Sequence, residues 1–211
     1  MTEQTVLLQI LLIFIIPVVL AYLGIIPVKI RLWLFLILFF LVIGVSYFER
    51  MSFDELGIRW DNFYESLVPY LLLTILGVTL IIIVAKLLNK KIHPRWWENP
   101  HFQFMFIFLS IAQEFMYRGF LMLKLELVIS SVFFVVILNT LIYMFLHIIY
   151  PNKASNLSLT FLGGLAFATV YYYYPNLILI SISHAILNFF AVLYGLVGFG
   201  SASKLNKAWN K

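Results

Sequence analysis

The stretch "FQFMFIFLSIAQEFMYRGFLML", residues 102–123, decides the fold class, because it is apolar over the length of a membrane-spanning helix. Such a helix needs about 20 mostly apolar residues to cross the hydrocarbon core of a bilayer. Gln113, Glu114 and Arg118 nevertheless lie inside it. A charged side chain at the bilayer centre costs roughly 2.5–3.5 kcal/mol or more, so we interpret these residues as part of a candidate functional site.

The composition of the whole chain agrees with this interpretation. Of its 211 residues, 64% are hydrophobic and 11% are charged, and the mean hydropathy is +1.02. Soluble domains average about 45–50% apolar and about 25% charged residues. We therefore predict an integral membrane protein that forms a single membrane domain over residues 1–211 and contacts membrane lipids. Without cysteine, the chain has no disulfide, no thiolate metal site and no cysteine nucleophile.

Seven segments are apolar enough to predict an all-α, polytopic bundle of about seven transmembrane helices. The first begins near Glu3 and lacks a basic leader, so we predict a retained span rather than a cleaved signal peptide. No internal repeat of the kind found in inverted-repeat transporters is evident. The predicted spans are residues 5–24, 31–48, 66–88, 102–123, 128–149, 157–174 and 177–198.

The basic residues sort to one side of this predicted topology. Only Arg50, Arg59 and Lys124 fall on the other side. Cytoplasmic loops carry the excess of Lys and Arg, so we predict a cytoplasmic C-terminus and an external N-terminus. The net charge of +5 follows from this arrangement, and we predict no nucleic-acid partner. The cytoplasmic set is Lys29, Arg31, Lys86, Lys90, Lys91, Arg95, Lys153, Lys204, Lys207 and Lys211.

Three predicted spans carry polar pairs one helical turn apart: Glu114 with Arg118, Tyr143 with His147, and His184 with Asn188. Each pair also has a structural interpretation: mutual neutralisation, an interfacial histidine, or interhelical hydrogen bonding. Glu114 lies about twelve residues, or roughly 18 Å, inside its span, and His184 is expected near the same depth on an antiparallel span. His147 lies closer to the cytoplasmic end, which fits if water enters from that side. The common depth favours one polar site shared by three helices.

Two other functional classes use the same residues. Glu114, His147 and His184 form a two-histidine, one-carboxylate set that suits a metal, but no HExxH or other helix-borne metal signature is present. Intramembrane Glu and His residues also serve as proton relays in transporters, although the absence of repeats argues against that class. We predict a site without metal or cofactor.

Two short motifs predict local structure rather than chemistry. "MSFDELGIRW" (residues 51–60) has the Ser52-x-x-Glu55 pattern of a capping box and a glycine at 57, which together predict a short interfacial helix. Gly164 and Ala168 have the small-xxx-small spacing that lets membrane helices approach closely.

The polar motifs resemble those of a known family. "QEFMYRGFL" (113–121) is similar to the EExxxR motif of the CPBP intramembrane proteases, the CAAX-protease and bacteriocin-processing family. "YMFLH" (143–147) is similar to its FxxxH element, with Tyr in place of Phe, and "HAILN" (184–188) matches its HxxxN element. The resemblance covers roughly residues 102–198, and the first three predicted spans carry no matching motif.

This resemblance implies a metal-independent glutamate endopeptidase of the bacterial cell membrane that hydrolyses a membrane-associated or bacteriocin-like peptide. In the family, the first glutamate of the EE pair and the FxxxH histidine activate water, which would assign His147 here. The HxxxN pair stabilises the oxyanion, which would assign His184 and Asn188. A buried carboxylate is a suitable general base, and donors aimed at an oxyanion contribute about 3–4 kcal/mol each.

The chain departs from the family motif at Gln113, which stands where the first glutamate is expected. A carboxamide can hold a water molecule but cannot accept its proton at neutral pH. Three explanations are open: Glu114 acts as the base while Gln113 orients the water; the chain is a catalytically impaired immunity or regulatory protein; or Gln113 is a deliberate inactivating replacement. Because the other motif positions are intact, we favour Glu114 as the base, unless Arg118 holds it as a purely structural pair.

Overall fold

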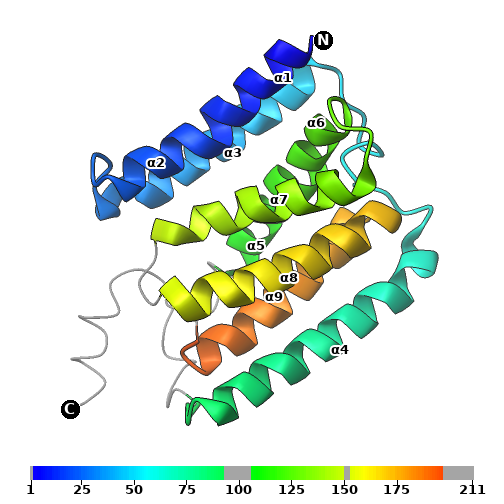
Figure 1. The fold of residues 1–211 in the computed structure, drawn as a ribbon. Helices are drawn as coiled ribbons and strands as arrows, with labels where there is room; N and C mark the ends of the chain where they lie inside the picture. Colours follow the sequence, from blue (N-terminus) through cyan, green and yellow to red (C-terminus); the bar gives the residue numbers. More distant parts are fainter. Residues whose placement is uncertain (1, 93–105, 150–152, 197–211) are drawn as a thin grey trace.

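The computed structural model describes residues 2–92, 106–149 and 153–196 (Figure 1). These residues form seven helical rods and contain no β-strand, which confirms the predicted all-α fold. In three rods a short π- or 3₁₀-helix lies within the α-helical part or directly after it. A further 3₁₀-helix, η2 (Val28–Ile30), leads into α3. The rods are α1 (Glu3–Ile10), η1 (Leu11–Ile15) and α2 (Ile16–Tyr22); α3 (Arg31–Phe48); α4 (Phe63–Leu87); α5 (Phe106–Glu114), η5 (Phe115–Leu121) and α6 (Met122–Glu126); α7 (Val132–Leu146) and η6 (His147–Ile149); α8 (Lys153–Tyr173); and α9 (Leu177–Leu193).

Each predicted span corresponds to one of these rods. The first five rods are long and apolar enough to cross a membrane, whereas residues 157–173 and 177–193 form shorter apolar helices. Three boundaries differ from the prediction by four or more residues: the fifth rod begins at Val132 rather than at residue 128, α8 begins at Lys153 rather than at residue 157, and α9 ends at Leu193 rather than at residue 198. The start of the fourth span, residues 102–105, lies outside the described residues.

The rods pack side by side as a bundle (Figure 1). The rod formed by α1 and α2 runs beside α3 on one side of the bundle, and α4 lies on the opposite side. Between them, α9 packs against both α4 and α5, and α7 packs against α8. The polar motifs lie on α5 and η5, on α7 and η6, and on α9, and each of these rods packs against other helices of the bundle.

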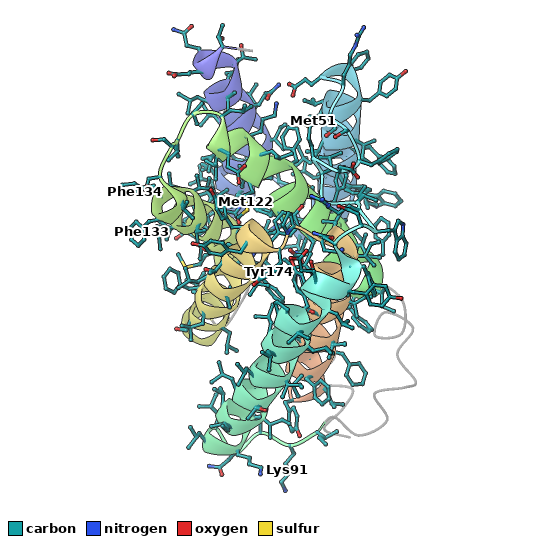
Figure 2. The ribbon with its side chains drawn as sticks, turned by 90° about the vertical axis from the view of Figure 1, so that its right-hand side faces the viewer. Met51, Lys91, Met122, Phe133, Phe134 and Tyr174 are labelled. Carbon is teal, nitrogen blue, oxygen red and sulfur yellow. The ribbon has the colours of Figure 1, made fainter. Side chains whose placement is uncertain are left out.

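Large apolar side chains cover the outside of the bundle, as lipid contact requires. Phe133 and Phe134 project outward from the start of α7 (Figure 2), where they are 66% and 56% exposed. Contiguous exposed apolar surface of this kind indicates a membrane environment or an interface. Together with the lengths of the helices, it describes a multi-pass membrane protein.

Two π-helices interrupt the rods for different reasons. The first, η1, ends just before Pro17, whose ring removes a backbone donor and clashes with the preceding turn. A wider turn accommodates this clash. The second, η5, contains Arg118 and Gly119 and directly follows Glu114. Such π segments are frequent at functional sites, and this one lies within the candidate motif.

The segment between α3 and α4 docks onto η5 through the backbone. A Cβ atom at Gly119 would lie 3.0 Å from the carbonyl oxygen of Leu56, so only glycine leaves room for this contact. The Ser52–Glu55 capping box is formed, with each backbone N–H donating to the other side chain. The predicted short helix is nevertheless wrong: the segment makes one turn and stops at Gly57, whose φ of +74° ends it in the left-handed region.

Candidate active site

Glu114 and Arg118 form the expected pair on one helix face, inside the bundle. Both side chains are fully buried, and Arg118 Nε lies 3.4 Å from Glu114 Oε2. Arg118 also donates from a terminal guanidinium nitrogen to the carbonyl oxygen of Gly164, at 3.2 Å. Within the described part of the chain, Glu114 Oε2 and two guanidinium nitrogens of Arg118 have no hydrogen-bond partner. The pair is therefore neutral in sum but keeps unused hydrogen-bonding capacity.

The second carboxylate oxygen of Glu114 binds His184 on α9. His184 Nδ1 lies 2.5 Å from Glu114 Oε1, a short charge-assisted contact. On the other edge of the ring, His184 Nε2 lies 3.3 Å from the hydroxyl of Tyr143. The ring of Phe167 covers the imidazole at a centroid distance of 5.4 Å. These contacts fix the plane and the orientation of a histidine that is only 4% exposed.

Tyr143 joins the two sides of the cluster. Its ring lies under the guanidinium of Arg118, with 4.4 Å from Cζ to the ring centroid, a cation–π contact worth about 2 kcal/mol when desolvated. Gly164 provides the space for this stack, because a Cβ atom there would lie 3.2 Å from Tyr143 and 3.4 Å from Thr140. The predicted small-residue face on α8 is confirmed, since Ala168 on the same face is fully buried.

The remaining motif residues lie beside this cluster rather than in it. His147 Nδ1 lies 3.1 Å from the carbonyl oxygen of Tyr143, one turn earlier, and its ring contacts the Tyr143 ring at 5.0 Å. Asn188 donates to the Ser110 hydroxyl at 3.1 Å. Gln113 is partly exposed. The structure therefore pairs Glu114 with His184, whereas the family resemblance paired the catalytic carboxylate with His147.

Sequence reasoning did not identify several contributors to the site. Ser110 accepts a hydrogen bond from Asn188. It lies one turn before Glu114, and this i, i+4 spacing was the signal in the sequence that could have identified it. Phe167 carried no signal, because an aromatic residue in an apolar helix is ordinary. Tyr143 was singled out by its spacing from His147, but that spacing gave no hint of its bond to His184 on another helix.

A pocket of about 220 Å³ reaches the cluster from the side of the α3–α4 segment. Arg118 lies at its inner wall, and Asp54, Glu55 and Arg59 line its mouth. This volume holds several water molecules at about 30 Å³ each. Polar solvent can therefore approach Arg118 from this end of the bundle.

The alternative of a metal centre lacks geometric support. Across residues 2–92, 106–149 and 153–196, no three His, Asp or Glu side chains are placed together to bind a metal. Instead, Glu114 Oε1 binds His184, and Glu114 Oε2 lies beside Arg118. What the arrangement offers is acid–base chemistry: a buried carboxylate, an imidazole and a phenol linked by successive hydrogen bonds.

The structure is that of a multi-pass helical membrane protein with a buried cluster of a carboxylate, an imidazole and a phenol. Residues 95–190, slightly less than half of the chain, match the family described as Rce1-like, type II CAAX prenyl endopeptidase. This match confirms the resemblance to CPBP proteases that the three motifs predicted. No curated protein and no solved structure gave a match.

Proposed function

We propose that this protein hydrolyses a peptide bond of a membrane-associated hydrophobic peptide, and that Glu114 supplies the carboxylate on which activation of water depends. The observation that carries the proposal is the pairing of a fully buried Glu114 with His184 at 2.5 Å. Burying charge in an apolar bundle is expensive, and a carboxylate held by one imidazole is poised for general acid–base catalysis.

The neighbouring motif residues fit roles around this carboxylate. Gln113 can hold the attacking water through its amide, and His147, the first residue of η6, can help to position it. Asn188 lies one turn from His184 on α9 and can donate to the oxyanion. All of these side chains except His184 are partly exposed, which suits groups that must meet a substrate.

The substrate class is a further part of the proposal. The matched family is described as a type II CAAX prenyl endopeptidase, whereas the motif resemblance also covers proteases of bacteriocin-like peptides. Two probes separate these classes: a farnesylated peptide with a C-terminal CAAX sequence and an unmodified hydrophobic leader peptide.

The test is a cleavage assay in proteoliposomes, with product analysis by mass spectrometry. We expect hydrolysis of one probe by the protein as it stands, more hydrolysis by Gln113→Glu, and none by His147→Ala. Full activity in Glu114→Gln would contradict the role of Glu114.

Gln113 favours a second candidate function, in which the protein binds a peptide without cleaving it and acts in bacteriocin immunity or regulation. The same assay distinguishes the two. Activity that appears only in Gln113→Glu, together with retained peptide binding by the starting protein, supports the binding function.

The proposed orientation in a bacterial cell membrane, with the C-terminus in the cytoplasm, has its own test. The chain has no cysteine, so one introduced cysteine is the only thiol. Ser52→Cys and Lys29→Cys place it at exposed positions at opposite ends of the second rod. We expect an impermeant maleimide added to intact cells to label the cysteine at position 52 and not the one at 29. The reverse pattern would invert the topology.

A further inference from the structure

His184 bridges two groups that constrain its protonation. Its Nδ1 lies 2.5 Å from Glu114 Oε1, and its Nε2 lies 3.3 Å from the Tyr143 hydroxyl. An ionised carboxylate can only accept a hydrogen bond, so Nδ1 carries a hydrogen and donates it. In a neutral ring Nε2 is then the acceptor, and the Tyr143 hydroxyl donates to it.

The charge of the cluster favours this neutral ring. Glu114 and Arg118 are both fully buried, and their charges cancel. A protonated His184 would leave the buried cluster with an uncompensated positive charge, and burying such a charge is costly. Before reaction, His184 Nε2 is therefore a basic nitrogen that accepts the hydroxyl proton of Tyr143, and the carboxylate of Glu114 binds the opposite edge of the imidazole ring.

We propose that Tyr143 is a further catalytic residue, which shuttles the proton of the attacking water to His184. The inference rests on the proposed peptidase function and specifies how Glu114 acts there. As the water oxygen bonds to the scissile carbonyl carbon, its proton moves to Tyr143 Oη while the phenolic proton moves to His184 Nε2. The carbonyl becomes an oxyanion, and Glu114 stabilises the imidazolium. When the C–N bond breaks, the proton returns through Tyr143 to the leaving amine, so that one water is consumed and an acid and an amine form.

The surroundings of Tyr143 suit a proton shuttle. The guanidinium of Arg118 lies 4.4 Å from the centre of its ring and stabilises negative charge that develops on the phenolic oxygen. Glu114 Oε1 is already bonded to His184, so the carboxylate orients the imidazole in the manner of a catalytic triad. Gln113 cannot accept a proton. A hydroxyl that can both accept and donate supplies what the amide lacks.

The experiment is a double-mutant cycle in proteoliposomes, using whichever of the two probe peptides is cleaved. Tyr143→Phe removes the hydroxyl and keeps the ring under Arg118. Tyr70→Phe is the matched control, because Tyr70 is also buried and its hydroxyl donates to a carbonyl oxygen, that of Tyr174 at 2.9 Å. We expect Tyr143→Phe to lower kcat by about 10²- to 10⁴-fold with little change in KM, and the control to be nearly unchanged.

The second arm of the cycle separates a shuttle from a structural role. In the Gln113→Glu background a carboxylate can take the proton directly, so we expect Tyr143→Phe to cost less than about threefold there. An equal loss in both backgrounds would overturn the shuttle. In ¹⁵N-histidine NMR spectra without substrate, Tyr143→Phe should shift the Nε2 resonance of His184 and Tyr70→Phe should not; an unshifted resonance in Tyr143→Phe also overturns it.

The outcomes distinguish the two proposals. Cleavage by the starting protein that Tyr143→Phe leaves unchanged would overturn the shuttle and leave the proposed function intact. Absence of cleavage by both the starting protein and Gln113→Glu would overturn the proposed function, and the shuttle with it.

Discussion

Replacing Arg118 by methionine is the sharpest test of how the buried cluster is held together. The substitution keeps an unbranched side chain of similar length but removes the charge that balances Glu114. It also removes the bond to Gly164 and the stack on Tyr143. Breaking a buried pair by deleting one partner costs about 3–5 kcal/mol, because the other charge stays buried and uncompensated.

For a chain of this size, 1 kcal/mol shifts the unfolding midpoint by about 2–4 °C, so we expect a loss of about 6–20 °C. The assay is thermal unfolding in detergent micelles, followed by far-ultraviolet circular dichroism. Arg59→Met is the matched control, since Arg59 pairs with Asp61 at the surface, where their side chains are 29% and 62% exposed. An exposed pair contributes at most about 1 kcal/mol, so the control should move the midpoint little.

The double variant Arg118→Met with Glu114→Gln completes the test. Removing both charges abolishes the uncompensated carboxylate, and the amide oxygen of Gln can still accept from His184. We expect the double variant to be more stable than Arg118→Met alone, with a coupling of about 1–3 kcal/mol. Additive losses, or equal losses in Arg118→Met and Arg59→Met, would refute the argument that Arg118 compensates a buried charge.

Three further predictions concern the segments around the site. Gly119→Ala should destabilise the fold and increase proteolysis of the α3–α4 segment, because the new Cβ atom would lie 3.0 Å from the Leu56 carbonyl oxygen. Gly163→Ala is the control: a Cβ atom there meets no atom within 4 Å, so the substitution should be neutral or slightly stabilising. Lys124→Met should lower the free energy of unfolding by about 1–3 kcal/mol, measured by denaturant titration, because Lys124 is fully buried against a carboxylate that is still partly exposed. A hydrogen bond from the backbone N–H of Ser52 lowers the pKa of Glu55 below its ordinary value of 4.5. The difference in free energy of unfolding between the starting protein and Glu55→Gln should therefore be constant above about pH 4.5. It should disappear as the pH falls through the lowered folded-state pKa. A gap that persists at low pH would contradict that last prediction.

The helices could be predicted from the sequence because lipid leaves the backbone few choices. A chain in hydrocarbon must satisfy its backbone hydrogen bonds within each segment, so a long apolar run is a helix almost by necessity. The boundaries were less predictable, since Val128 and Ile129 are apolar although the helix begins only at Val132. Lys124 shows the same limit: it lay just beyond a predicted span, yet it is fully buried in α6 and paired with Glu49.

The candidate site was predictable in its membership but not in its pairings. Spacing of i, i+4 places two residues on one face of a helix, and this was sufficient to single out Glu114, Tyr143 and His184. It does not fix how neighbouring helices are rotated or offset, so the bonds that His184 makes to the other two could not be derived. The π-helix η5 adds to the difficulty, because a wider turn shifts the faces of all residues that follow Glu114.

The way the cluster divides its hydrogen bonds argues against a purely structural role for Glu114. A carboxylate kept only to neutralise Arg118 would be expected to take the bidentate geometry that guanidinium groups favour. Instead, one oxygen of Glu114 bonds His184, and Arg118 spreads its contacts over the Gly164 carbonyl and the Tyr143 ring. Within the described residues this leaves Glu114 Oε2 and two guanidinium nitrogens without hydrogen-bond partners, at a cost of about 1–3 kcal/mol for each group. Unsatisfied buried groups of this kind are retained where they serve a reaction or a ligand, and a scissile peptide with its attacking water can supply the donors and acceptors that the folded chain omits.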